Sequence, residues 1–219
     1  MENSSLPAVE LVIRTMAETV VANEAYFSQL DAVVADGDFG FSLARGFQAV
    51  LAGFDQFDRA SVGTFLKKIA LVISSQVGGA SGPLWGTAFL RAAGAAADKR
   101  TIAPADAIAM LRAAATGIQA RGGAVLGDKT LLDALIPATD ALEAALARTE
   151  PGEALRLAAE EARRAAEATA AMMAKKGRAA YTGERSIGSV DAGAVAIAVI
   201  AEAVSSKWRE RYEKGKEPA

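Results

Sequence analysis

Apolar residues recur along this chain at helical spacing, and short segments rich in glycine or proline separate the stretches that show it. Between residues 40 and 54, for example, Phe41, Ala44, Phe47, Val50 and Leu51 fall on one face of a helix. Alanine and leucine are abundant, whereas runs of β-branched residues bounded by turns are scarce. The pattern therefore predicts an all-α protein.

Proline, glycine and capping residues divide this pattern into eight predicted helices joined by short links. Pro7, Pro104 and Pro151 stand where a helix begins, and Pro137 predicts a bend inside another helix. The predicted ranges are about 7–30, 40–54, 61–76, 84–97, 104–120, 130–147, 151 to 175 or 176, and 191–212. Because no link is long enough to separate two domains, we expect a single domain over residues 1–219.

Glycine and aspartate concentrate in four of the predicted connections, at residues 31–40, 78–86, 122–129 and 177–193. These connections follow the first, third, fifth and seventh helices. In an up-and-down array of antiparallel helices, alternate connections share one end. We therefore expect the four segments to converge on a single rim.

The composition excludes several kinds of chemistry. The 219 residues include no cysteine and no histidine, which removes disulfides, thiolate nucleophiles, histidine general bases and histidine-ligated zinc. The formal net charge of −2 offers no basic field for nucleic acid or anionic lipid. Catalysis in this chain would have to use carboxylates, arginine, lysine, backbone amides and a hard metal ion.

A charge-free stretch over residues 69–90 is about long enough to cross a bilayer. Gly78, Gly79, Gly82 and Pro83 interrupt its middle, and a helix exposed to lipid could not carry such a break. The first seven residues also lack the basic and then apolar order of a signal peptide. We expect a cytoplasmic protein with no membrane span.

Three carboxylates lie close together in the first glycine-rich connection. Asp31, Asp36 and Asp38 would repel one another unless a cation compensates them, and oxygen ligands of this kind suit Mg²⁺ or Ca²⁺. The spacing does not fit an EF-hand, because positions five and twelve counted from Asp36 are Gly40 and Phe47. The alternative is a turn rich in aspartate in which Asp38 caps the next helix.

The second connection, Gly78-Gly-Ala-Ser-Gly-Pro-Leu-Trp-Gly86, suits an anion. Glycine lets backbone amides approach a phosphate, Ser81 adds a hydroxyl, and a helix beginning near Leu84 would favour negative charge. A flexible corner without a ligand explains the glycines equally well.

The third connection, Gly122-Gly-Ala-Val-Leu-Gly-Asp-Lys-Thr130, is a near miss to the phosphate-binding P-loop. Asp128 occupies the position of the P-loop lysine and no strand precedes the segment, so a P-loop is rejected. The segment could still present backbone amides and Lys129 at the start of a helix.

The fourth connection runs from Gly177 to Asp191 and contains Arg178 and Arg185, which suit phosphate oxygens. The alternative is a surface loop in which Glu184 pairs with one of the arginines. In that reading Asp191 serves only as the N-cap of the last helix.

Together these segments resemble the L subunit of dihydroxyacetone kinases, which also occurs as the C-terminal nucleotide domain of single-chain forms. The resemblance covers almost the whole chain in the family's order. Its motifs are Asp31…Asp36-Gly-Asp-Phe-Gly40 with Arg45-Gly-Phe47, Gly78–Gly86, Gly127-Asp-Lys-Thr130 with Asp133, and Gly177-Arg-Ala-Ala-Tyr-Thr-Gly-Glu-Arg-Ser186 with Asp191 and Gly193.

The resemblance implies an eight-helix antiparallel up-and-down barrel that binds ADP or ATP and two Mg²⁺ ions. The metal ligands would be Asp31, Asp36 and Asp38, and Arg178 would assist phosphoryl transfer as the catalytic residue. Phe39 and Ser42 stand where the family usually has histidine and asparagine. The implied nucleotide pocket comprises Phe39, Gly40, Ser42, Gly79, Ala80, Ser81, Gly122, Leu131, Arg178, Asp191 and Gly193.

The resemblance also implies partners. In the family a histidine of a separate K-type subunit holds the ketose covalently, and this chain has no histidine. We expect such a subunit and a phosphotransferase-system phosphocarrier as partners, with ATP as the alternative donor, and leave a homodimer open. A regulatory nucleotide-binding module and a carrier of apolar ligands are the alternative functions.

Overall fold

The computed structural model describes residues 4–213, which contain helices and no β-strand. The first of them, α1 (Leu6–Ala22) and α2 (Glu24–Asp31), follow one another closely. The other long helices are α3 (Phe39–Gly53), α4 (Val62–Gln76), α5 (Ser81–Ala96), α6 (Pro104–Gly122), α7 (Leu132–Leu146), α8 (Pro151–Ala168) and α9 (Ala192–Tyr212). The short 3₁₀ helices are η1 (Phe54–Gln56), η2 (Thr169–Ala171) and η3 (Arg178–Ser186).

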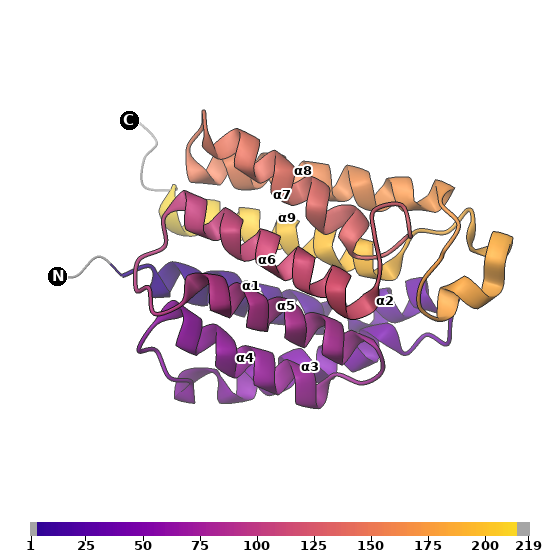
Figure 1. The fold of residues 1–219 in the computed structure, drawn as a ribbon, viewed down its shortest axis with the longest axis horizontal. Helices are drawn as coiled ribbons and strands as arrows, with labels where there is room; N and C mark the ends of the chain where they lie inside the picture. Colours follow the sequence, from indigo (N-terminus) through magenta and orange to yellow (C-terminus); the bar gives the residue numbers. More distant parts are fainter. Residues whose placement is uncertain (1–3, 214–219) are drawn as a thin grey trace.

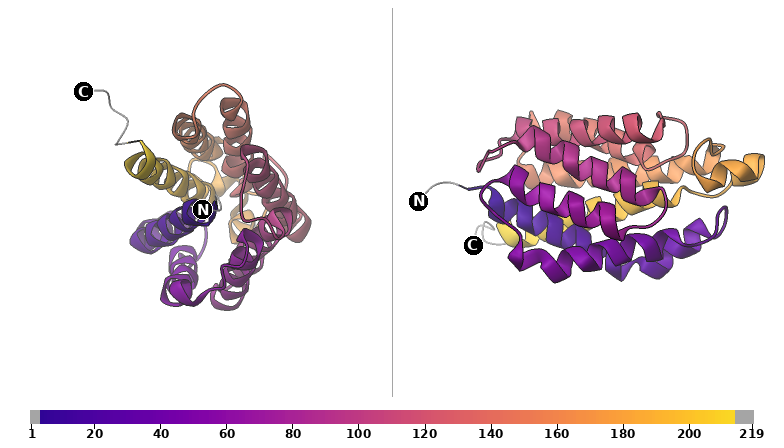
Figure 2. Two further views of the ribbon diagram at one scale, coloured as in Figure 1. Left: turned by 90° about the vertical axis from the view of Figure 1, so that its left-hand side faces the viewer. Right: turned by 60° about the horizontal axis from the view of Figure 1, so that its bottom comes forward.

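The long helices form a closed ring. From α3 to α9 each helix packs against the next one in the chain, α3 packs against α1 and α2, and α9 packs against α1 to close the circle. Figure 1 shows that neighbouring helices run in opposite directions, and Figure 2 shows the ring along its axis. With α1 and α2 counted as one segment, this is the expected eight-helix antiparallel barrel.

Aromatic side chains fill the middle of the ring. Phe47 lies edge-on to Trp85 with their ring centroids 6.0 Å apart, and Phe54 lies edge-on to Phe65 at 5.5 Å. These four residues are buried, and they belong to a core that α1, α3, α4, α5 and α9 share. Burying each such ring stabilises the fold by about 1.5–3 kcal/mol relative to leaving it exposed.

The first predicted helix, about 7–30, is wrong at one point because the chain breaks at Asn23. Asn23 has φ −106° and ψ 15°, and its side-chain amide donates a 2.8 Å hydrogen bond to the carbonyl oxygen of Thr19. Asparagine competes with the helix for such backbone partners. The result is the separate α2, which ends at Asp31.

The seventh predicted helix is too long, because α8 ends at Ala168 rather than at Lys175 or Lys176. Thr169 is fully buried, and its hydroxyl donates a 2.5 Å hydrogen bond to the carbonyl oxygen of Ala166. The same hydroxyl accepts a 2.8 Å hydrogen bond from the backbone N–H of Asp191. A contact with a distant segment therefore ends a helix that the local sequence favours.

Smaller boundary differences fall at the starts of two helices. The structure begins α5 at Ser81 instead of Leu84, and it begins α7 at Leu132 instead of Thr130. The prediction that Ser61 caps α4 is confirmed, because its side chain accepts a 3.1 Å hydrogen bond from the backbone N–H of Thr64.

The charge-free stretch 69–90 is divided between α4 and α5. Within residues 4–213, no helix is both long enough and apolar enough to cross a membrane. The expectation of a single domain over residues 1–219 stays a prediction, and its first three and last six residues lie outside the described range.

Candidate functional site

All four glycine-rich connections lie at one end of the ring, on the right in Figure 1. Close contacts link the second connection to the start of α3, and the third connection to the second. A side chain at Gly78 would come within 3.4 Å of the Ser42 hydroxyl, and one at Gly122 within 3.0 Å of Leu84. These contacts confirm the expected convergence on one rim.

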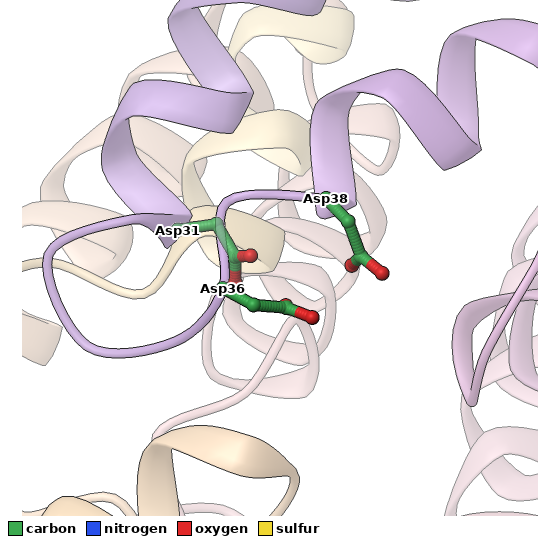
Figure 3. Close-up of side chains that lie close together, drawn as sticks. All are labelled: Asp31, Asp36 and Asp38. Atoms are coloured by element: carbon green, nitrogen blue, oxygen red, sulfur yellow. The ribbon is translucent and has the colours of Figure 1, made fainter.

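The carboxylates of Asp31, Asp36 and Asp38 form a cluster at this end, as Figure 3 shows. Each residue places one carboxylate oxygen so that the three oxygens lie within 4.8 Å of one another. Asp31 ends α2, and the other two belong to the loop before α3. An all-oxygen donor set of this kind fits a hard divalent cation.

Glycine makes the loop that holds this cluster possible. Gly37 has a φ of +75°, a left-handed conformation that L side chains rarely adopt. Gly40 lies so close to α2 that an added Cβ would overlap the carbonyl oxygen of Glu24 and lie 2.6 Å from the backbone nitrogen of Ser28. The Ser28 hydroxyl also accepts a 3.2 Å hydrogen bond from the N–H of Phe41. These contacts fix the start of α3 against α2.

The surroundings of the carboxylates set their charge. Burial raises the pKa of Asp31, and the backbone N–H groups of Phe39 and Gly37 partly offset this by hydrogen bonding to its carboxylate. The Arg178 guanidinium lowers the pKa of Asp36 through a hydrogen bond. Hydrogen bonding to Arg178 thus favours the charged form of the Asp36 carboxylate, whereas burial disfavours the charged form of Asp31.

Arg178 brings a positive charge to this cluster. Its Nη1 donates a hydrogen bond to Oδ2 of Asp36 and lies 3.1 Å from Oδ2 of Asp38. Asp38 makes no side-chain capping bond to α3, and no ion pair of Glu184 is described. The structure therefore describes neither the side-chain cap by Asp38 nor the Glu184 ion pair, and Arg178 pairs with Asp36 and Asp38 instead.

A second group of donors surrounds the start of α5. Gly79 has a φ of +61°, and no backbone hydrogen bond is described for the N–H groups of Gly79, Ala80 or Ser81. The Ser81 hydroxyl likewise caps nothing in α5. Free N–H groups at a helix start attract anions, because the helix dipole adds to their own positive ends.

Two of the expected pocket residues face different surroundings. Ser42 lies in the first turn of α3, and its hydroxyl would lie 3.4 Å from a Cβ added at Gly78 in the second connection. The Phe39 ring is half-buried, with its centroid 6.3 Å from that of Phe27, and it packs against the main core. Phe39 contributes its backbone N–H to Asp31 rather than a polar side chain to the rim.

The third connection rests on its own small core. Leu84, Leu131 and Ala124 belong to a cluster between α5, α6 and α7. A Cβ at Gly193 would lie 3.3 Å from the Cβ of Leu131, so the start of α9 adjoins the start of α7. Gly122, Leu131 and Gly193 thus lie in adjoining parts of the rim, as the sequence led us to expect.

Sequence reasoning missed a set of buried charges under the rim. Lys129 is only 2% exposed, and the Asp133 carboxylate accepts hydrogen bonds from the N–H groups of Gly127 (2.5 Å) and Thr130 (2.7 Å). The sequence signal for these buried charges was the presence of Asp128 and Lys129 directly after Gly127, with Asp133 shortly after them.

Asp191 combines two roles in this region. Its Oδ2 accepts a 2.7 Å hydrogen bond from the N–H of Ala194, which confirms that it caps α9. Its pKa is raised to about 7, chiefly by burial and also by the carboxylates of Asp133 and Asp31, while the N–H of Ala194 and the Lys129 ammonium act in the opposite direction. This carboxyl group therefore titrates near neutral pH.

A family model called the DAK2 domain matches residues 33–206, which is most of the chain and includes Asp36, Asp38 and Arg178. The chain belongs to the DAK2 domain family. Asp31, the first carboxylate of the cluster, precedes the matched range by a short distance.

Relatives of this DAK2 domain are subunits or parts of ketose kinases. It is 38% identical over 173 residues to the protein of Escherichia coli (strain K12) named "PEP-dependent dihydroxyacetone kinase, ADP-binding subunit DhaL", covering 78% of this chain and 82% of that one. It is also 38% identical over 195 residues to an L-erythrulose 1-kinase of Mycolicibacterium smegmatis. That match covers 88% of this chain and 34% of the larger enzyme.

Solved structures show the same fold. The native form of the dihydroxyacetone kinase of C. freundii gives a TM-score of 0.74 at 25% identity, covering 91% of the DAK2 domain chain and 34% of that kinase. The same kinase in complex with AMP-PNP and Mg²⁺ gives a TM-score of 0.75 at 24% identity. The DAK2 domain described here spans about a third of that enzyme.

Proposed function

We propose that this chain is the nucleotide-binding subunit of a cytoplasmic kinase of the dihydroxyacetone kinase type. It would bind ADP or ATP with two Mg²⁺ ions and pass a phosphoryl group to a short-chain ketose. A separate K-type subunit would hold that ketose covalently. The observation that supports this most directly is that Arg178 contacts Asp36, which lies 142 positions away in the chain, and also Asp38.

In this proposal the residues of the rim have different roles. Asp31, Asp36 and Asp38 would hold the metal ions, which supply neutralisation of the charge on the phosphates. The free amides of Gly79, Ala80 and Ser81 would bind phosphate oxygens at the start of α5. The remaining lining of the pocket would come from Phe39, Gly40, Ser42, Gly122, Leu131, Arg178, Asp191 and Gly193.

Arg178 would have two successive roles in this proposal. Its guanidinium contacts the carboxylates that would hold the metal ions, so guanidinium and metal would compete for the same oxygens. Once released, the guanidinium is close enough to the cluster to bind a phosphoryl oxygen. Arginine is suited to this role because it stays charged and presents a planar fork of donors.

The relatives' names suggest the type of phosphoryl donor and the class of ketose. The Escherichia coli relative is named as PEP-dependent and ADP-binding, which favours recharging of bound ADP by a phosphotransferase-system phosphocarrier. The Mycolicibacterium relative is named for L-erythrulose, a four-carbon ketose. We therefore propose a three- or four-carbon ketose as the substrate.

A partner would dock at the rim, because exposed apolar side chains surround it. Tyr181 is 90% exposed, and its neighbours on the site loops are also open to solvent. We define this apolar rim as Val33, Phe41, Val125, Leu126, Met173, Tyr181 and Ile187. Exposed apolar groups gathered in one region are typical of protein–protein contact sites.

The metal role is tested by Asp36→Ala. We expect it to abolish Mg²⁺-dependent binding of ADP while leaving the helical content intact, because Asp36 lies in an exposed loop. Calorimetry would compare it with Asp98→Ala, which changes an exposed aspartate at the opposite end of the ring. Unchanged ADP affinity in Asp36→Ala would rule out the metal role.

The two-subunit reading is tested with the purified chain alone. We expect no phosphorylation of dihydroxyacetone from ATP, because this chain has no histidine with which to hold the ketone. A coupled assay for dihydroxyacetone phosphate would measure the rate with and without a K-type subunit. Robust turnover by the chain alone would overturn the requirement for a partner.

A further inference from the structure

The segment that carries Arg178 is held at both of its ends by one buried side chain. Residues 172–189 connect η2 to the region before α9, and Figure 2 shows this segment projecting beyond the ends of the other helices. The Lys129 ammonium donates hydrogen bonds to three carbonyl oxygens in it. These belong to Met172 (3.1 Å), Ser186 and Ser189 (2.7 Å).

The position of Lys129 is unfavourable in free energy by itself. It is 2% exposed and has a φ of +62°, a left-handed conformation that is unfavourable for a lysine. Burial lowers its pKa, and the carboxylate of Asp191 opposes that change. A buried cation in a strained backbone persists only where the surrounding structure compensates it.

The ammonium has no donor left for a ligand. A lysine side chain carries three N–H donors, and here three carbonyl oxygens accept from it. Lys129 is therefore not placed to bind phosphate as the lysine of a P-loop does. Its partners lie on both sides of Arg178 in the sequence, so it closes the segment between them into a loop.

Other hydrogen bonds at the base of this loop agree with such a role. The Ser186 hydroxyl accepts from the N–H of Ala174 at 2.9 Å and donates to the carbonyl oxygen of Gly183 at 2.6 Å. The N–H of Lys175 donates to the carbonyl oxygen of Asp128 at 3.0 Å, which ties the loop to the residue before Lys129. Arg178, which lies between these anchoring residues in the sequence, contacts the carboxylates of Asp36 and Asp38 at the rim.

We propose that Lys129 is a positioning residue that acts through Arg178. By closing residues 172–189 into a fixed loop, it holds the guanidinium against Asp36 and Asp38. This inference rests on the proposed function for the meaning of the carboxylate cluster. The fixed loop itself is a property of the protein without any ligand, so the two can be tested separately.

The first test is a double-mutant cycle measured as Mg²⁺ affinity of the full chain without nucleotide, by calorimetry. Arg178→Ala removes the competing guanidinium, and we expect about tenfold tighter Mg²⁺ binding. Lys129→Met keeps the length of the side chain, frees the loop and should tighten Mg²⁺ binding by several-fold. Lys175→Met changes an exposed lysine of the same loop that lies 3.5 Å from the Asp128 carboxylate, and because a pair with one exposed partner contributes little, it should leave the affinity unchanged.

The double variant decides between positioning and simple loss of charge. If Lys129 acts through Arg178, Lys129→Met adds less than about twofold in the Arg178→Ala background. A full additional gain there would show a direct electrostatic effect and overturn the proposal. A general loosening of the fold would weaken Mg²⁺ binding instead, and weaker binding in Lys129→Met would also overturn it.

The second test needs neither metal nor nucleotide. Arg178 and Arg185 are exposed, yet the closed loop should protect the wild-type chain from trypsin after both residues. We expect cleavage there to be at least tenfold faster in Lys129→Met and unchanged at Arg185 in Lys175→Met. Rapid cleavage of the wild type at these two arginines would overturn the fixed loop, even if Lys129→Met did not fold. Absence of Mg²⁺ binding in every variant, with protection intact, would contradict the proposed function only.

Discussion

Asp191 makes a contribution of its own to the pH dependence of this protein's stability. Its pKa is about 7 in the folded chain, well above the ordinary value of 3.8. Between these two values the folded state binds a proton that the unfolded state has released. The free energy of unfolding therefore falls as the pH rises through this window, and the whole penalty is present above pH 7.

Asp191→Asn should remove this dependence while keeping the cap on α9, because an asparagine oxygen can accept the hydrogen bond from Ala194. Relative to the wild type, we expect the variant to gain roughly 1–3 kcal/mol of stability between pH 5 and pH 8. Urea unfolding at the two pH values measures the difference. Parallel curves for both proteins would show that burial does not raise this pKa.

At the scale of the elements, the packing of α3 against α2 depends on Gly40. Gly40→Ala would push a methyl group into the backbone of α2, and we expect a loss of about 2–4 kcal/mol of stability. Gly79→Ala is the matched control, because its Cβ would meet nothing within 4 Å. The control should cost only about 1–2 kcal/mol, from the left-handed backbone at that position.

Thermal and urea unfolding of both variants would test this difference. The carboxylate cluster should also loosen in Gly40→Ala, since α2 ends at Asp31. Equal losses of stability in the two variants would mean that α2 can move away from α3 without cost.

The elements also show what the sequence could and could not predict. Helical spacing and proline positions identified the helices of the barrel. Ser61 was recognised as a helix cap because its hydrogen-bond partner lies only three residues away. The end of α8 was missed because Thr169 binds Asp191, and that contact exists only in the folded chain. Local propensity favours helix through this alanine-rich segment, and tertiary contacts override it.

In the site, too, features set by local sequence were predicted and features set by tertiary contacts were not. Asp31, Asp36 and Asp38 lie close in sequence, so their grouping was predicted, and the rim followed from the alternation of connections. The resemblance placed Arg178 in the same site, but its direct ion pair with Asp36 and Asp38 was not predicted, because the partners lie far apart in the sequence and Glu184 is a nearer one. The burial of Lys129 could not be read from a segment that looks like an exposed turn.

At the scale of the whole molecule, the apolar rim predicts where a partner subunit would bind. Leu126→Ser combined with Tyr181→Ser should lower partner-dependent turnover at least tenfold, because exposed apolar side chains often anchor such contacts. The affinity for ADP and Mg²⁺ should stay within about twofold of the wild type, since neither side chain belongs to the proposed pocket.

The matched control is Leu71→Ser combined with Leu90→Ser, which changes two exposed leucines on α4 and α5 that do not belong to the apolar rim. This variant should leave turnover unchanged. Titration with a K-type subunit would measure both pairs. A loss of turnover with the control pair, or none with the rim pair, would place the docking surface elsewhere.

The contact between α1 and α9 makes the order of helices around the ring independent of where the chain is cut. The start of α1 and the end of α9 lie at the end of the molecule opposite the rim (Figure 1). A circular permutant that joins these ends and opens the short connection at residues 147–150 would keep every helix beside its present neighbours. A permutant opened at residues 123–131 would instead cut through the segment that holds Lys129. We therefore expect the backbone to tolerate a cut at the end of the ring opposite the rim, and to tolerate it less well at the rim, where the cut would separate Lys129 from one of its flanking helices.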